Sequence, residues 1–125
     1  MATLTTTDNV QYYFDPGAVF AISDRDPSTG RVVTCIHGIS GRAYLPIAES
    51  VQAFIARVKI AAADFASVSG PNGTVYLLRL SSVVSICPTT VGAPPGTHAV
   101  VFAGSQNFSV VETPQTAAAA LKISA

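Results

Sequence analysis

Charged residues are scarce in this chain. Only 11% of its 125 residues are Asp, Glu, Lys or Arg, whereas soluble domains average about 25%. Seven basic residues balance seven acidic ones, so no basic surface for nucleic acid or an anionic membrane is indicated. Because 49% of the residues are hydrophobic, we expect part of the surface to be buried against other copies of the chain or against another assembly subunit.

Long apolar runs are also absent. No stretch approaches the ~20 apolar residues that span a bilayer, and the N-terminal MATLTTTDNV lacks the basic and apolar regions of a secretory signal. We therefore expect no membrane partner, and a location in the cytoplasm or in a virion-like particle.

Cysteine and histidine occur only twice each. Cys35 and Cys87 are too few for a disulfide framework, and both lie in apolar strand-like runs, so we interpret them as reduced core residues. Cys35 and His37 would share one side of a strand, as a cysteine nucleophile and its base require. A buried cysteine beside a strand-end histidine explains the pair without chemistry, and we adopt that interpretation.

Other chemical motifs are missing from the sequence. No His, Cys and carboxylate cluster has the spacing of metal ligands, and no glycine-rich phosphate motif is present. We therefore predict no catalytic residue, no metal and no cofactor.

Two segments of the chain repeat each other. Residues 49–60 read ESVQAFIARVKI and residues 112–123 read ETPQTAAAALKI. Strand-like runs precede both in matching order, at 10–14, 18–23, 32–38 and 43–49 and again at 75–80, 82–87, 99–104 and 108–112. Chance matches among common residues are the alternative explanation.

The repeat predicts an α+β fold. It consists of an internally duplicated β-β-β-β-α unit, with antiparallel sheets packed with two helices. Residues 1–9 would form an N-terminal arm, and residues 10–125 a single domain of two repeats, 10–66 and 74–125.

Both predicted helices have start signals. Ser50 is a candidate cap for the first helix, and Thr113 with Pro114 begins the second. The first helix is predicted to carry one apolar stripe of Val51, Phe54, Ile55, Val58, Ala62 and Phe65. The second is Ala-rich, with small side chains at the corresponding places.

The strand at 32–38 is apolar on both sides, as in strands covered on both faces. The cover would come from the opposite half of the chain or from another subunit. With the low charge and the Thr-rich arm, this pattern favours a non-enzymatic structural or assembly subunit that forms a homo-oligomer or larger particle.

The duplicated order of four strands and a helix resembles that of PUR-repeat and whirly-type proteins, which bind single-stranded nucleic acid. In those proteins the two units pair through their helices. The Lys-Gly-Lys-Ala-like segment of whirly-type proteins has no counterpart here, so no functional residue is carried over. The resemblance implies an alternative function, binding of single-stranded nucleic acid.

Three arginines and a tyrosine are the candidate residues for that alternative. Arg25, Arg31, Arg42 and Tyr44 fall in or beside the two connectors of the first half, where arginine and an aromatic ring could bind a phosphate or a base. Solvated loop arginines balanced by neighbouring aspartates explain the same residues.

A second resemblance is local. NGTVYLLRLSSVVSI and THAVVFAGSQNFSVVET are similar to a small flagellar-operon protein family. The shared pattern is Asn-Gly, two strands, a turn, another strand and then Val-Val-x-Glu before a helix. It implies an order of turns and strands and no chemistry.

Overall fold

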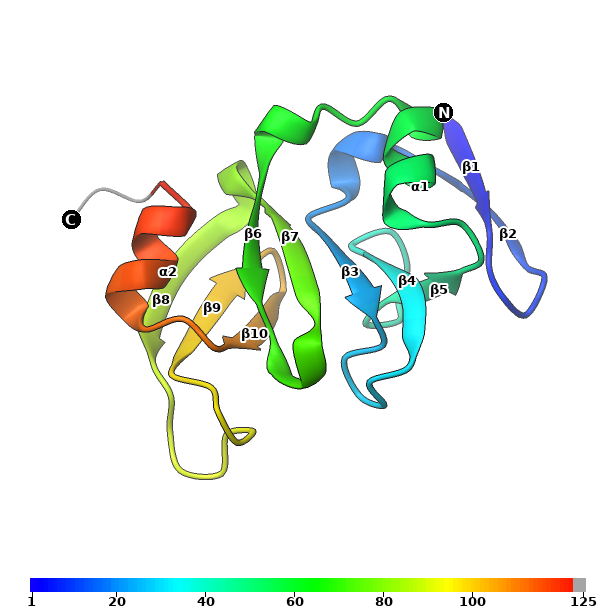
Figure 1. The fold of residues 1–125 in the computed structure, drawn as a ribbon. Coiled ribbons are helices and arrows are strands. Elements are labelled where there is room, and N and C mark those ends of the chain that lie inside the picture. The colour runs from blue at the N-terminus through cyan, green and yellow to red at the C-terminus, as the bar shows by residue number, and fades with distance from the viewer. Residues whose placement is uncertain (123–125) are drawn as a thin grey trace.

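The computed structural model describes residues 1–122. Within that range the chain forms ten strands in three antiparallel sheets and two helices (Figure 1). The predicted α+β class is therefore confirmed. None of the described helices is long and apolar enough to cross a membrane.

The two halves have the same order of elements. The first comprises β1 (Ala2–Thr5), β2 (Gln11–Phe14), β3 (Ala21–Arg25), β4 (Val32–His37), β5 (Leu45–Ile47) and α1 (Val51–Val58). The second comprises β6 (Phe65–Ser69), β7 (Val75–Arg79), β8 (Val83–Pro88), β9 (Ala99–Ala103), β10 (Gln106–Val110) and α2 (Pro114–Ala120). Each half thus has five strands before its helix, where the sequence predicted four. Internal duplication remains a prediction.

The expected N-terminal arm is part of the fold. β1 pairs antiparallel with β2, from Ala2 opposite Phe14 to Thr5 opposite Gln11. Leu4 is 1% exposed and packs into the core. The threonines around it are compatible with a strand because their polar side chains can alternate with a buried one.

The first helix is shorter than its apolar stripe predicted. Lys59 adopts a left-handed conformation with φ 60°, and the Ile60 N–H donates to Ile55 O at 3.1 Å, which closes α1. Ala62 lies in a short 3-10 turn and Phe65 begins β6. The apolar spacing therefore continued past the helix by coincidence.

The predicted helix starts are confirmed. The Ser50 hydroxyl accepts the Ala53 N–H at 3.2 Å, and the Thr113 hydroxyl accepts the Thr116 N–H at 3.3 Å. Pro114 occupies the first position of α2, where a missing N–H has no cost.

The largest sheet joins the two halves. Its strand order is β5-β4-β3-β7-β6, beside a β1-β2 pair and a β10-β9-β8 sheet. Figure 1 shows α1 and α2 on opposite sides of the β6–β7 hairpin. This arrangement differs from the paired helices of the PUR-repeat and whirly-type proteins.

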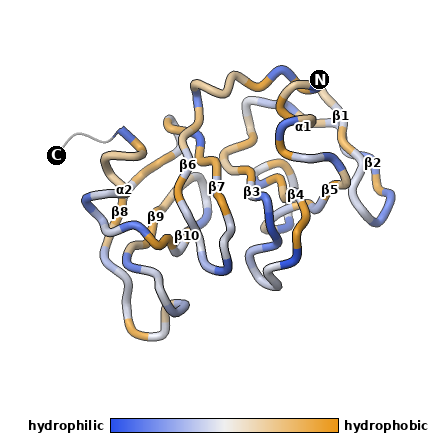
Figure 2. Tube along the Cα trace, viewed as in Figure 1, coloured by the Kyte–Doolittle hydropathy of each residue, from blue (hydrophilic) through white to orange (hydrophobic). Residues whose placement is uncertain are grey.

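A hydrophobic core lies on each face of this sheet. Along β3, Ala21 faces the core of the second half, while Ile22 faces that of the first half. Figure 2 shows hydrophobic segments along several of these strands, such as β4 and β9. Core residues of the first half include Leu4, Phe14, Ile36, Leu45 and Phe54. Those of the second half include Val68, Tyr76, Leu78, Phe108 and Ala117.

The second part of β4 is buried on both sides, as predicted, whereas Val32 at its start is 74% exposed. Its residues from Thr34 to His37 are all buried. Ile36 faces the first core, while the ring of His37 packs against Phe108 of the second half at 5.5 Å between centroids. The sequence left open whether the second face of this strand is covered by the opposite half of the chain or by another subunit. In the structure the opposite half covers it at His37.

Candidate functional site

An open cavity of about 450 Å³ lies where the loops of the two halves meet. Aromatic rings from both halves line it. His37 lies 5.4 Å from Tyr44, and Tyr76 lies 5.0 Å from Phe108. Gln106 completes the polar part of the wall.

The imidazole of His37 is hydrogen-bonded at both nitrogens. The side-chain amide of Gln106 donates to Ala43 O, so its oxygen accepts a hydrogen bond from His37 Nδ1 at 2.9 Å. His37 Nε2 then lacks a proton and accepts from the Ser23 hydroxyl at 3.4 Å. Burial lowers the pKa of His37, although the bond to Gln106 acts in the opposite direction. The ring is therefore a neutral part of the interface between the halves.

This burial predicts acid sensitivity. A histidine with a lowered folded-state pKa contributes stability above its ordinary pKa of about 6.5, and that contribution is lost as the pH falls through the folded value. We expect the free energy of unfolding to decline from about pH 7.5 to about pH 5, and the decline to be smaller in His37→Gln. Urea denaturation at several pH values measures both. An equal decline in the two proteins would show that other groups cause it.

Cys35 does not have the properties of a nucleophile. Its side chain is 0% exposed. Burial, with the nearby negative charge of Asp26, raises the pKa of the thiol to about 11, so the thiol stays protonated at neutral pH. The strand does bring Cys35 and His37 close to Ser23, but as parts of a buried network.

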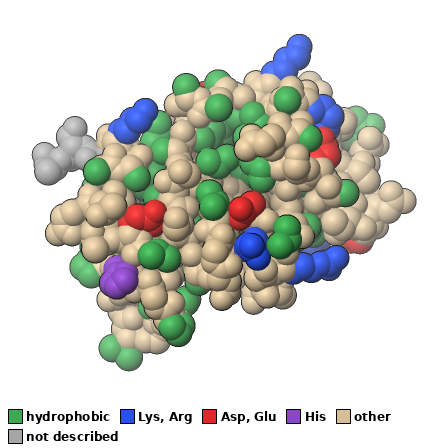
Figure 3. All heavy atoms as spheres, in the orientation of Figure 1, with side chains coloured by type: hydrophobic (Ala, Val, Ile, Leu, Met, Phe, Trp, Pro, Cys, Tyr) green, Lys and Arg blue, Asp and Glu red, His purple; other side chains and the backbone are tan. Residues whose placement is uncertain are grey.

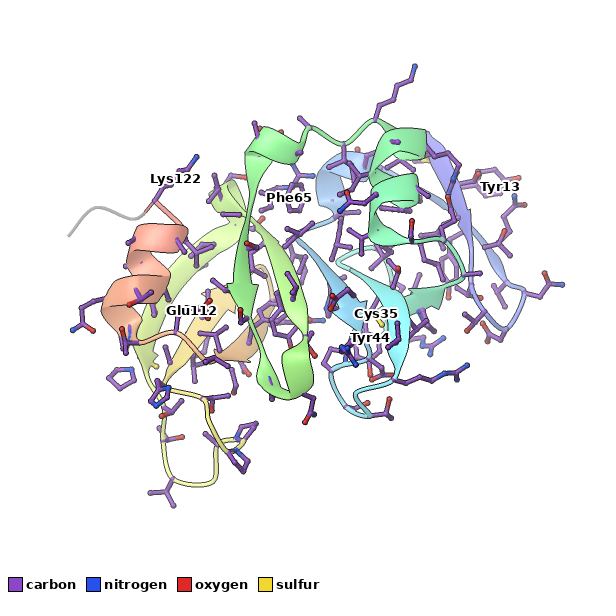
Figure 4. All side chains as sticks on the ribbon, viewed as in Figure 1. Tyr13, Cys35, Tyr44, Phe65, Glu112 and Lys122 are labelled. Atoms are coloured by element: carbon purple, nitrogen blue, oxygen red, sulfur yellow. The ribbon has the colours of Figure 1, made fainter. Side chains whose placement is uncertain are left out.

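The structure brings the two connectors of the first half together. The Tyr44 hydroxyl donates to Asp26 Oδ1 and lies 2.9 Å from Ser28 Oγ. Its ring packs against His37, so both parts of the tyrosine have partners within the chain (Figure 4).

The candidate arginines lie around this junction. Arg25 ends β3 and donates to Gly30 O at 3.4 Å. Arg31 precedes β4, and Arg42 lies in the loop before β5. Arg42 is near enough to Asp8 for their charges to interact, and Arg31 lines a hollow together with Asp24 and Glu49.

Two open strand edges are the feature that sequence reasoning missed. β2 pairs only with β1, and β8 pairs only with β9, among the strands of residues 1–122. Both edges carry an exposed apolar side chain, Tyr13 at 70% and Val84 at 74% exposure. The sequence identified both strands but carried no signal for their pairing.

No group of three His, Cys, Asp or Glu side chains in residues 1–122 could hold a metal ion. No known protein-family model, curated protein or solved structure matches the chain.

Proposed function

We propose that this protein is a non-enzymatic structural subunit that assembles with copies of itself into a homo-oligomer or larger particle. The observation that carries the proposal is the pair of open strand edges, β2 and β8, at opposite ends of the molecule in Figure 1. An open edge presents unpaired N–H and C=O groups that pair readily with another strand.

The sequences of these edges support pairing. Proteins commonly protect an open edge with charged side chains, above all lysine. β2 reads QYYF and β8 reads VVSICP, and neither contains a charge. The low charge of the whole chain also reduces repulsion between copies.

Sedimentation velocity over a range of protein concentrations tests this function. We expect a mass above that of a single chain, increasing with concentration and little affected by salt, because apolar surface and backbone hydrogen bonds provide the contact. A single species with the mass of one chain at millimolar concentration would contradict the proposal.

Binding of single-stranded nucleic acid is the second function that the sequence raised. We expect no salt-dependent binding of short single strands, because the net charge is zero, carboxylates lie near Arg31 and Arg42, and Tyr44 has partners inside the chain. Fluorescence anisotropy with labelled oligonucleotides at low and high salt measures this. Binding that weakens with salt and is lost in Arg31→Ala would favour the alternative.

A further inference from the structure

The contact between the two halves is itself a pairing of strand edges. β3 and β7 run antiparallel, with Ala21 opposite Leu78, Ile22 opposite Leu77 and Ser23 opposite Tyr76. The three β3 residues are at most 1% exposed. Edge pairing at this junction therefore accompanies full burial of the three paired residues of β3.

The strands form one continuous succession through the molecule. A bridge between Thr6 and Ile47 connects β1 to β5. The Val111 N–H donates to Ser69 O at 2.7 Å, which connects β10 to β6. With the sheet pairings, the order is β2-β1-β5-β4-β3 and then β7-β6-β10-β9-β8. The two halves have the same internal order, and the internal junction joins the last strand of one to the first strand of the other.

The two end strands of this succession, β2 and β8, correspond to the two strands of the internal junction, β7 and β3. β8 occupies the place of β3: both follow a 3-10 turn, and Ile86 pairs with Val101 as Ile22 pairs with Ile36. β2 occupies the place of β7. The side chains of Ser85, Ile86 and Cys87 remain exposed or half-buried, unlike those of β3.

From this correspondence we propose that copies of the chain join head to tail, with β8 of one copy pairing antiparallel with β2 of the next. The register is that of β3 and β7, so Ile86 faces Tyr13 of the second copy, and Cys87 faces Tyr12 of the second copy. The inference rests on the proposed assembly function and specifies its interface. Such a contact is heterologous, and it builds rings or filaments.

The hydrogen-bonding directions agree with this register. Thr89 N–H donates to His98 O of the neighbouring connector, and directions alternate along a strand, so the N–H of Ile86 points away from β9. Arg79 N–H donates to Phe20 O at 2.8 Å, which by the same alternation makes Ile22 and Leu77 a hydrogen-bonded pair. Ile86 and Tyr13 of the second copy would form the equivalent pair.

Pro88 sets the length of the pairing. It has no N–H to offer at the open edge, so pairing ends after Cys87. At the internal junction pairing likewise ends after Ser23, at the register shift of β3. Both junctions therefore comprise three paired residues.

At the proposed junction a larger strand side chain is matched by a smaller helix side chain than at the internal junction. A hollow of about 260 Å³ at the internal junction is lined by Ile22 and Leu77 with Val51 at the start of α1, and Figure 3 shows hydrophobic side chains between α1 and the β6–β7 hairpin. At the proposed junction, Tyr13 of the second copy takes the position that Leu77 has at the internal junction. The tyrosine side chain is the larger of the two. The core there has Ala117 of α2 in place of Phe54 of α1, so the smaller helix residue leaves room for the larger ring.

A cysteine introduced at Tyr12 tests the register. Opposed residues in a non-hydrogen-bonded antiparallel pair have Cα atoms about 4.5 Å apart, which permits a disulfide. We expect oxidised Tyr12→Cys protein to form a ladder of linked chains on a non-reducing gel, and the additional change Cys87→Ser to abolish it. Tyr13→Cys is the matched control, because its side chain points to the other face of the strand.

A charge at Tyr13 tests the contribution of the edge to assembly. Tyr13→Glu affects a side chain that is exposed within one copy (Figure 4), so folding should be retained. Association should weaken about ten-fold or more, because the new carboxylate would be buried without a partner. Val91→Glu places the same charge on an exposed loop valine outside both edges, and we expect it to leave association unchanged.

The outcomes separate the interface from the function. A wild-type protein that assembles, with Tyr13→Glu assembling equally well and Tyr12→Cys forming no Cys87-dependent ladder, would overturn the interface and leave the assembly function standing. A wild-type chain that remains a monomer at millimolar concentration would overturn both.

Discussion

Replacing Phe54 by alanine is expected to lower the free energy of unfolding by about 3–5 kcal/mol. The Phe54 side chain is 0% exposed, and its ring stacks on Phe14 with centroids 6.0 Å apart and planes 13° apart. Truncation leaves a cavity beneath α1 that the surrounding strands cannot fill. Urea or guanidinium denaturation, monitored by circular dichroism, measures the change.

Phe102→Ala is the matched control for this variant. It removes the same atoms from β9, but Phe102 is 39% exposed, so we expect a loss of roughly 1 kcal/mol. Equal losses in the two variants would mean that α1 is not anchored by Phe54 as described.

Replacing Gly38 by alanine is expected to cost about 2–4 kcal/mol. Gly38 has φ +108°, a conformation that other residues rarely adopt, and a Cβ there would lie 2.5 Å from Ala18 O and 2.7 Å from the Phe20 ring. The backbone oxygen cannot move aside without disturbing the entry to β3. Denaturation under the same conditions as for Phe54→Ala gives the loss.

Gly41→Ala provides the comparison for Gly38→Ala. Gly41 lies in the same loop with nothing within 4 Å of an added Cβ, so the change should stay within about 0.5 kcal/mol. If Gly38→Ala proved as mild as Gly41→Ala, the close packing of Phe20 against this loop would be disproved.

Local signals explain what the sequence predicted well. Ser50 and Thr113 cap helices through hydrogen bonds to N–H groups three residues away, and such contacts depend only on neighbouring residues. The end of α1 was harder to predict, because the left-handed residue there is Lys59 rather than glycine. Phe65 matched the helical spacing although it belongs to β6.

Long-range pairing explains what the sequence could not provide. β1 is short and rich in threonine, and it is stabilised by β2 and by burial of Leu4. Arg31 and Arg42 lie in the connectors as expected, whereas Arg25 ends β3 and Tyr44 lies just before β5. The hydrogen bond from Tyr44 to Asp26 depends on how two loops meet. β2 and β8 are left as open edges because β3 pairs with β7. No local sequence pattern encodes that pairing.

A structure of the assembled protein, by electron cryomicroscopy or crystallography, tests the central claim most directly. The account predicts β8 of each copy beside β2 of the next, antiparallel, with Ile86 opposite Tyr13. Assembled particles in which both edges face solvent, while copies touch through other surfaces, would contradict it.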